Sequence, residues 1–552
     1  MGLESSVQHE YSAGSVAPAS SRASSYQGGQ TDGMTTQNIA ERFEITPEEG
    51  ILLYPHQHED DDELHQPDDE KEARSWNVFT RRGLVQVGSL MFIVLGLLTM
   101  FIGYPIINYA RNIGNELVND PCPFGPGLCL DMDSIPHLTN YRSSLIDPDT
   151  PKLAFTKKSV DGKDWKLVFS DEFNVENRTF YPGDDPYWEA VNIHYMATAD
   201  LEWYDPDAAT TKDGVLELEF AKFRNHDLDF RSAMLQSWNK LCIKGGIIEA
   251  SISLPGSGDI PGFWASFWTM GNLGRPGYLA STEGIWPYTY HDGCDAGITA
   301  NQSSADGLSY LPGMRLPGCI CAGEDHPTPG KARGAPEIDA LEASVGKITN
   351  GKMVGTASQS SQVAPFDIWY QPDYDQVAVY NPDFTSMNSY RGGQYQEVIS
   401  GLTTLNNDWY DGKAYQTYGF EYKPGDDGYI EFFIGDMHTW RINSAATRAN
   451  GNVGRRPIPQ EPMALILNFG MSPSFTFIDF DRLNTLLPAK MRIDYIRIYQ
   501  DPDNTIVTCD PPGYETTQYI GDHLKAYMNP NLTNWDSTDY DWPRNSLVDE
   551  CK

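Results

Sequence analysis

Three acidic residues with the potential for chemistry lie close together in the segment Glu337-Ile338-Asp339-Ala340-Leu341-Glu342. Paired carboxyl groups can break a glycosidic bond, because an ionised carboxylate attacks while a neutral one protonates the leaving oxygen. On a regular strand Glu337 and Asp339 share a face and Glu342 points the other way. A β-bulge near Ala340 or Leu341 would return Glu342 to the face of the other two. The spacing therefore predicts a carboxyl cluster on a bulged strand.

Such a cluster has a cost and a competing interpretation. Three like charges repel one another unless one carboxyl group holds a proton, and catalysis is a reason to tolerate this. The alternative is a solvated acidic strand. Acidic residues make up 76 of the 552 residues, so the bare spacing arises readily by chance.

The surrounding sequence predicts the strands that must position these carboxyl groups. From Trp165 onward apolar and polar residues alternate, as in Val215–Phe220 and in Ile248–Leu254, which is typical of half-buried strands. Turn signals such as Lys212-Asp213-Gly214 separate them. Long helical patterns and glycine-rich phosphate loops are absent. The pattern favours an all-β protein, a two-sheet antiparallel β-sandwich, with no cofactor.

The net charge and the spacing of potential metal ligands limit which binding partners and metal ions are expected. The net charge is −36, so nucleic acid and acidic polysaccharides are disfavoured and a neutral partner is expected. The histidines do not cluster, and Cys319-Ile320-Cys321 is not a zinc pattern. No metal site is predicted.

An uncharged apolar run extends over 83–107, between Arg82 and Arg111. Its length suits a single transmembrane helix, and a long buried globular helix is the alternative. Cations are more frequent before the run than after it, so the positive-inside rule places the N-terminus in the cytosol. The sequence thus predicts a type II signal anchor of the secretory pathway (endoplasmic reticulum, Golgi or plasma membrane).

Cysteines and glycosylation sequons support that orientation. All eight cysteines follow the apolar run, as do the sequons at Asn177, Asn301 and Asn531. Disulfides are therefore expected, although their connectivity cannot be deduced from the sequence. Cys509 and Cys551 bracket a C-terminal extension, 501–552, which we expect to be stapled onto the sandwich.

The segments on either side of the apolar run read as connecting chain. Residues 1–82 are polar and then acidic, so a disordered cytosolic tail is expected. The region near Tyr54 and the acidic runs is a candidate sorting or phosphorylation segment, with a plain solvated tail as the alternative. Residues 108–164 are rich in Pro, Asp and Ser and predict a luminal stem.

Several motifs resemble glycoside hydrolase family 16. Trp165–Phe173 resembles its opening strand, Glu337–Glu342 its bulged catalytic signature, and Ile493–Tyr499 its closing strand. A membrane-anchored fungal branch, the β-glucan synthesis-associated proteins of the Skn and Kre type, is more similar still. The segments that resemble this branch are Asp184–Trp188, Leu201–Asp207, Ser237–Cys242, Trp268–Gly277 and Ala364–Asp367.

The resemblance implies a β-jelly-roll over 165–500 and a retaining β-glucan hydrolase or transglycosylase in cell-wall β-1,6-glucan formation. It makes Glu337 the nucleophile, Glu342 the general acid/base and Asp339 the helper between them. A retaining site requires the two outer carboxyl groups to lie about 5–5.5 Å apart. The rival hypothesis is a non-catalytic glucan-binding or assembly factor that keeps the fold.

One position departs from the family pattern. Many soluble members carry a His in the strand that here reads Tyr415–Tyr422, and Gln416 is expected to occupy that place. A glutamine can bind a sugar hydroxyl or a carboxylate, but it cannot titrate near neutral pH.

Aromatic residues are candidates for stacking on sugar rings. Trp264 and Trp268 have the same strand parity, and by resemblance Trp264 lies nearer the scissile bond. Weaker candidates are Trp238, Trp286 and Trp369. For each Trp the alternative is core packing. Asn468 is a polar residue in an apolar strand, where it either binds substrate or makes a hydrogen bond within the sheet.

Overall fold

The computed structural model describes residues 81–103, 142, 144–290, 313–348, 351–364, 371–393, 395–449, 454–546 and 549–551. The chain divides into two compact units, 1–130 and 131–552. Several predictions lie outside the described residues: the tail with Tyr54, the stem before residue 142, Trp369, the sequon at Asn301, and Cys122, Cys129 and Cys294.

The first unit contains helix α2 (Arg81–Leu98), which continues into the π-helical turn η2 (Thr99–Gly103). Its large apolar side chains are exposed, with Phe92 at 79%. Within the described part of the chain, no helix has both the length and the apolar character needed to cross a membrane. The predicted transmembrane helix over 83–107 is therefore not found, and 104–107 lie outside the described residues.

The second unit is built around two large antiparallel sheets, of which the nine-stranded one carries the acidic segment. Among the described residues its order is β16 (Thr385–Met387), β17 (Glu397–Thr404), β14 (Met353–Val363), β13 (Glu337–Lys347), β12 (Trp264–Gly271), β21 (Met463–Gly470), β9 (Met234–Gln236) and β3 (Glu189–Ala190), with β10 (Cys242–Ile243) also pairing with β21.

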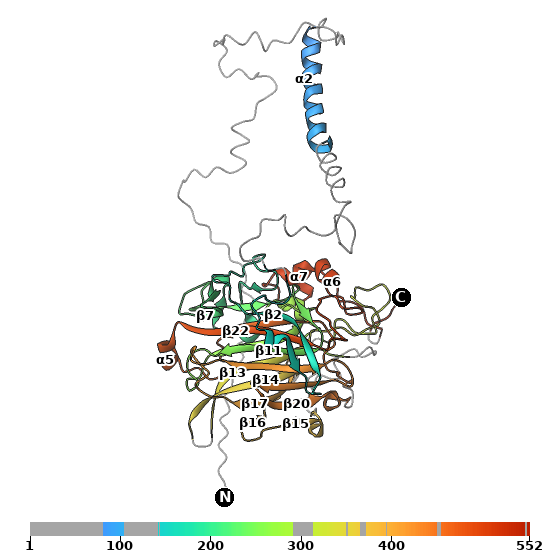
Figure 1. Cartoon of the computed structure of the whole chain (residues 1–552). Helices are drawn as coiled ribbons and strands as arrows, with labels where there is room; N and C mark the ends of the chain where they lie inside the picture. The colour runs from blue at the N-terminus through green and yellow to red at the C-terminus, as the bar shows by residue number, and fades with distance from the viewer. Residues whose placement is uncertain are drawn as a thin grey trace, which may run out of the picture. The chain divides into compact units, whose positions relative to one another are not determined.

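A ten-stranded sheet packs against it. Its order is β1 (Thr156–Lys158), β2 (Asp164–Asp171), β22 (Ala489–Gln500), β11 (Gly246–Ser253), β18 (Gln416–Lys423), β19 (Tyr429–Ile434), β20 (Met437–Asn443) and β15 (Val377–Val379). In addition, β7 (Val215–Phe220) pairs with β22 and β6 (Ala209–Lys212) pairs with β7. Figure 1 labels several strands of both sheets.

A small third sheet and short helices complete the unit. The sheet contains β4 (Ile193–His194), β5 (Glu202–Tyr204) and β8 (Phe230–Ser232), with β5 and β8 parallel. The α-helices are α4 (Leu279–Thr282), α5 (Phe480–Leu483), α6 (Thr517–Asp522) and α7 (Leu524–Met528). The 3-10 turns are η3 (Lys152–Phe155), η4 (Met196–Thr198), η5 (Pro206–Ala208), η6 (Tyr374–Gln376), η7 (Ser444–Thr447), η8 (Asn484–Leu486) and η9 (Asp536–Thr538).

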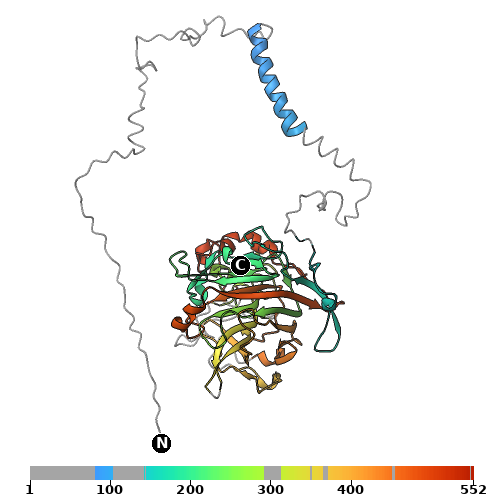
Figure 2. The same ribbon diagram turned by 60° about the vertical axis from the view of Figure 1, so that its left-hand side comes forward.

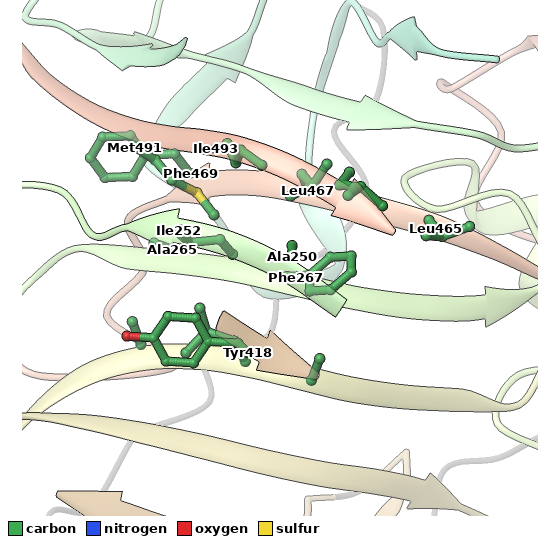
Figure 3. Packing of buried hydrophobic residues seen from close by; sticks show 14 of the residues in the cluster. Ala250, Ile252, Ala265, Phe267, Tyr418, Leu465, Leu467, Phe469, Met491 and Ile493 are labelled. Atoms are coloured by element: carbon green, nitrogen blue, oxygen red, sulfur yellow. The ribbon is translucent and has the colours of Figure 1, made fainter. Parts of the chain in front are cut away.

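The main core lies between the two large sheets. Alternate residues of facing strands meet there, for example Phe267 of β12, Ala250 of β11 and Leu467 of β21 (Figure 3). Because each strand contributes every second residue to this layer, the alternating sequence pattern yields one continuous apolar interior. The prediction of an all-β sandwich is confirmed.

Strand β11 departs from the prediction of a half-buried strand. Both of its faces are buried, including Glu249, Ser251 and Ser253. β11 lies between β22 and β18 in the middle of its sheet, and Lys157 of β1 forms an ion pair with Glu249. Glu249 is therefore buried and paired with a lysine rather than exposed to solvent.

The C-terminal extension is attached to the sandwich by disulfides, as the bracketing cysteines predict. Cys509 bonds to Cys242 of β10, and Cys551 bonds to Cys321. Helices α6 and α7 of the extension lie together at one end of the sandwich in both views (Figures 1 and 2). The extension packs against apolar side chains of β12 and β21 in a second buried cluster.

Candidate active site

The predicted β-bulge is present in β13. Along β14, Asp339 pairs with Ser360 and Glu342 pairs with Ser358, so two residues of β13 lie opposite Gln359 alone. The pairing with β12 shifts at the same place. Ala340 and Leu341 both contribute to the core between the sheets. The extra residue therefore returns Glu342 to the outer face of the sheet, the face of Glu337 and Asp339.

Glu337 is held by an indole that comes from far along the chain. Trp286 Nε1 donates a hydrogen bond to Glu337 Oε2 at 2.6 Å. An N–H donor stabilises the ionised form of a carboxyl group. Trp286 thus directly contacts the predicted nucleophile, a stronger role than its weak ranking as a stacking residue.

Asp339 is buried, with 2% of its surface exposed, and two side chains of β14 donate to it. Ser360 Oγ lies 2.6 Å and Gln362 Nε2 3.1 Å from Asp339 Oδ2. Both donors stand on the same face as the carboxyl groups because Ser360 and Gln362 pair with Asp339 and Glu337 across the ladder. They favour a charged Asp339.

Glu342 shares one of these donors. Ser360 Oγ also donates to Glu342 Oε2 at 3.3 Å, so a single hydroxyl bridges two carboxyl groups of the cluster. Trp264 Nε1 donates to Glu342 Oε1 at 3.2 Å. The ring of Trp264 stacks on Phe475 at a centroid distance of 4.1 Å. One ring face of Trp264 is thus taken by Phe475, while its indole nitrogen orients Glu342.

Burial and mutual repulsion keep protons on this cluster. Burial raises the pKa of Asp339 to about 6 and that of Glu342 to about 8. Burial, together with the charge of Asp339, raises the pKa of Glu337 well above its usual range. At neutral pH the cluster therefore cannot carry three negative charges. It offers both a neutral acid and a carboxylate, which is the pair that glycosidic cleavage requires.

Asn468 and Trp268 form a polar chain beside the cluster. Trp268 Nε1 donates to Asn468 Oδ1 at 2.8 Å, and Asn468 Nδ2 donates to the Tyr204 hydroxyl at 3.1 Å. Trp268 and Asn468 are both buried, each with 7% of its surface exposed. For these two residues the structure favours the alternative of internal packing and hydrogen bonding.

A second pair of acids was not anticipated from the sequence. The Tyr204 hydroxyl donates to Asp200 at 3.0 Å, and both oxygens of Glu202 accept from the backbone N–H of Met471. Burial raises the pKa of Asp200, and burial with the charge of Asp200 raises the pKa of Glu202 well above its usual range. Glu202 lies in the segment Leu201–Asp207 that resembles the family, and Asp200 immediately precedes that segment, which was their only sequence signal.

Two predicted binding residues are not brought to the cluster. Gln416 begins β18 in the ten-stranded sheet, and its amide oxygen accepts from the backbone N–H of Thr417 at 2.8 Å. Trp238 donates to the carbonyl of Asn272, and its ring stacks on Tyr527 of the C-terminal extension. Both expectations are corrected: Gln416 belongs to the other sheet, and Trp238 anchors the extension.

Two further predictions concern modification and metals. The sequon residues Asn177 and Asn531 are exposed. In the described parts of the chain, no three His, Cys, Asp or Glu side chains are grouped so that they could hold a metal ion.

Comparisons with known proteins identify similar chains. A family described as "Beta-glucan synthesis-associated protein SKN1/KRE6/Sbg1" matches residues 51–551. The chain is 48% identical over 519 residues to the beta-glucan synthesis-associated protein KRE6 of Saccharomyces cerevisiae, covering 92% of this chain and 70% of that one. It is 47% identical over 553 residues to SKN1 of Candida albicans, covering 96% and 72%. Among solved structures, the laminarinase from Rhodothermus marinus aligns with a TM-score of 0.37 and 20% identity, over 61% of this chain and 97% of that one.

Proposed function

The chain belongs to the family of beta-glucan synthesis-associated proteins SKN1/KRE6/Sbg1, and from this premise we propose that it is a retaining β-glucan hydrolase or transglycosylase in cell-wall β-1,6-glucan formation. One observation carries the proposal: the bulge in β13 gathers Glu337, Asp339 and Glu342 on one face, where an indole N–H contacts each of the two glutamates. Binding a neutral glucan without chemistry would not require three crowded carboxyl groups.

The first step needs an acid and a nucleophile. With its pKa raised to about 8, Glu342 is neutral at pH 7 and can protonate the leaving glycosidic oxygen. Glu337 attacks the anomeric carbon as that C–O bond breaks, which forms a glycosyl ester on its carboxyl oxygen. Glu342, now ionised, then takes a proton from water or from a sugar hydroxyl as that oxygen displaces Glu337. Water gives hydrolysis, and a sugar hydroxyl gives transfer.

Asp339 makes the nucleophile available. Glu337 and Asp339 hydrogen-bond to each other and both have raised pKa values, so the pair holds a proton near neutral pH. Glu337 can attack only when it is ionised, so in the reactive form this proton lies on Asp339, even though the hydrogen bonds from Ser360 and Gln362 favour the ionised form of Asp339. The N–H of Trp286 then stabilises the charge on Glu337.

The proposal includes an anchored, luminal or extracellular sandwich. It is supported by the uncharged run 83–107, by the exposed apolar side chains of α2, and by disulfides and exposed sequons in the second unit. Full-length protein in intact microsomes should resist alkaline carbonate extraction, and its sandwich should be protected from added protease. Digestion of the sandwich without detergent would refute this orientation.

The catalytic proposal is tested with the full-length chain in detergent. It is incubated with β-1,3- and β-1,6-linked oligosaccharides in ¹⁸O-labelled water, and the products are followed by mass spectrometry. Hydrolysis adds the label to shortened products, whereas transfer yields longer, unlabelled ones. Glu337→Gln should abolish both reactions. In the wild-type reaction, the anomeric carbon of the first product should have the same configuration as in the substrate.

A non-catalytic glucan-binding or assembly factor predicts the opposite results. Both oligosaccharides would remain unchanged, and Glu337→Gln would restore wall glucan in cells that lack the protein. That pair of outcomes would overturn the enzyme proposal.

A further inference from the structure

The bulge in β13 leaves one residue outside the residue pairing. β12 pairs with Asp339 and Leu341, and β14 pairs with Asp339 and Glu342, so Ala340 has no partner residue on either side. Ala340 is completely buried. A buried carbonyl without a hydrogen bond costs about 1–3 kcal/mol, so such a bulge needs a substitute donor.

Gln359 of β14 supplies that donor from directly opposite the bulge. Its Nε2 lies 2.9 Å from the carbonyl oxygen of Ala340. Gln359 is itself completely buried, and its side chain points into the core because its neighbours Ser358 and Ser360 face outward with the carboxyl groups. A buried amide among apolar side chains is expensive unless all its groups are bonded.

The same amide reaches a second bulge in the opposite sheet. Between β19 and β20 the pairing shifts from Phe432–Trp440 to Phe433–His438, which leaves Thr439 as the extra residue. Gln359 Nε2 donates to the carbonyl of Phe433 at 3.2 Å, and Thr439 Oγ1 donates to Gln359 Oε1 at 2.6 Å. Gln359 therefore connects one bulge in each of the facing sheets across the core.

We propose that Gln359 is a positioning residue for the carboxyl cluster: by joining the bulge at Ala340 to the bulge at Thr439, it fixes the register that holds Glu342 on the face of Glu337 and Asp339. This inference rests on the proposed function for its activity test. Its physical basis is that a strand's side chains change face with every single-residue shift, so the bulge must stay at one place. The Gln359 amide is hydrogen-bonded to the bulge of each sheet and so holds the bulge in β13 at this position.

The test uses Gln359→Met in the full-length chain. Methionine has nearly the same length but no N–H donor, so the carbonyls of Ala340 and Phe433 lose the hydrogen bonds from Gln359. Product formation should fall at least tenfold. The high-pH limb of the pH–rate profile, set by Glu342, should move because its contacts with Ser360 and Trp264 change. A crystal structure should show a displaced or disordered bulge.

Matched variants separate positioning from stability. Thr439→Val removes the bond that orients the amide and should cause a smaller loss, and Thr439→Ser should restore activity because it keeps the hydroxyl. Thr403→Val is the control, since the buried Thr403 hydroxyl bonds Thr385 at 2.9 Å at the edge of the nine-stranded sheet, which also contains Gln359. It should leave the pH–rate profile unchanged at a similar melting temperature.

The outcomes distinguish this inference from the proposed function. Absence of product from the wild-type chain would defeat the enzyme proposal. The crystal structure of Gln359→Met would still test whether Gln359 positions the bulge, because it shows the strand register directly. A Gln359→Met structure with the wild-type register and carboxyl separation would overturn the inference. If Gln359→Met does not fold, a wild-type pH–rate profile in Thr439→Val would overturn it instead.

Discussion

The hydrogen bond from Trp286 to Glu337 gives the sharpest prediction about the proposed nucleophile. Trp286→Phe keeps an aromatic ring but removes the N–H that lies 2.6 Å from Glu337 Oε2. The donor opposes burial and the charge of Asp339, which both raise the pKa of Glu337. Without it the pKa of Glu337 should rise further.

The size of the effect follows from the bond type. A hydrogen bond to a charged group contributes about 1.5–3 kcal/mol, and about 1.4 kcal/mol corresponds to one pKa unit or a tenfold change in rate. The loss should therefore raise the pKa of Glu337 by roughly one to two units. Because Glu337 acts only when ionised, activity at pH 7 should fall about 10- to 100-fold, and the low-pH limb should move upward by the same one to two units.

The assay is the rate of oligosaccharide product formation measured from pH 4 to pH 9. Trp203→Phe is the matched control, since Trp203 Nε1 donates at 2.6 Å to the amide oxygen of Asn192 rather than to a carboxyl group of the cluster. Its profile should coincide with that of the wild type. If Trp286→Phe changed KM alone and left the low-pH limb in place, the indole would act on the sugar and the reasoning about Glu337 would be refuted.

Three other predictions concern stability and modification. As pH rises from the ordinary carboxyl pKa of 4.5 to about 8, the unfolded chain loses the Glu342 proton while the native state keeps it, so the free energy of unfolding falls. Glu342→Gln should therefore raise the melting temperature, and by more at pH 8 than at pH 5. Equal shifts at the two pH values would contradict this. Arg333→Met should cost about 3–5 kcal/mol in denaturant unfolding because Glu461, 2.7 Å away, is left buried and unpaired, whereas Arg333→Met with Glu461→Leu should recover most of it. Asn177→Gln and Asn531→Gln should each remove one endoglycosidase-sensitive band shift, and an unshifted wild-type chain would exclude both sites.

The carboxyl cluster shows how far local sequence reasoning reaches. The period of a strand is two, so Glu342 could join Glu337 and Asp339 only through an inserted residue, and the bulge lies where that argument put it. The alternation of apolar residues likewise predicted the sandwich. These inferences depend on neighbours along the chain, which the sequence displays directly.

Contacts between distant segments were beyond this reasoning. Trp286 lies on Glu337 although 51 residues separate them, and Gln359 meets Phe433 across 74 residues. Gln416 was expected near the site by family resemblance, but β18 lies in the ten-stranded sheet, because a local stretch of sequence does not specify which strands a strand pairs with. Trp238 similarly has a partner, Tyr527, that only the folded C-terminal extension brings to it.

The sequence by itself thus determined the strand pattern, the bulged acidic motif and the family that these motifs resemble, because each is written in consecutive residues. Tertiary structure alone decided which indoles and hydroxyls meet the carboxyl groups, which acids share protons, and which cysteines pair. Those properties depend on distance and burial, and both are set by how the two sheets stack rather than by any local stretch of chain.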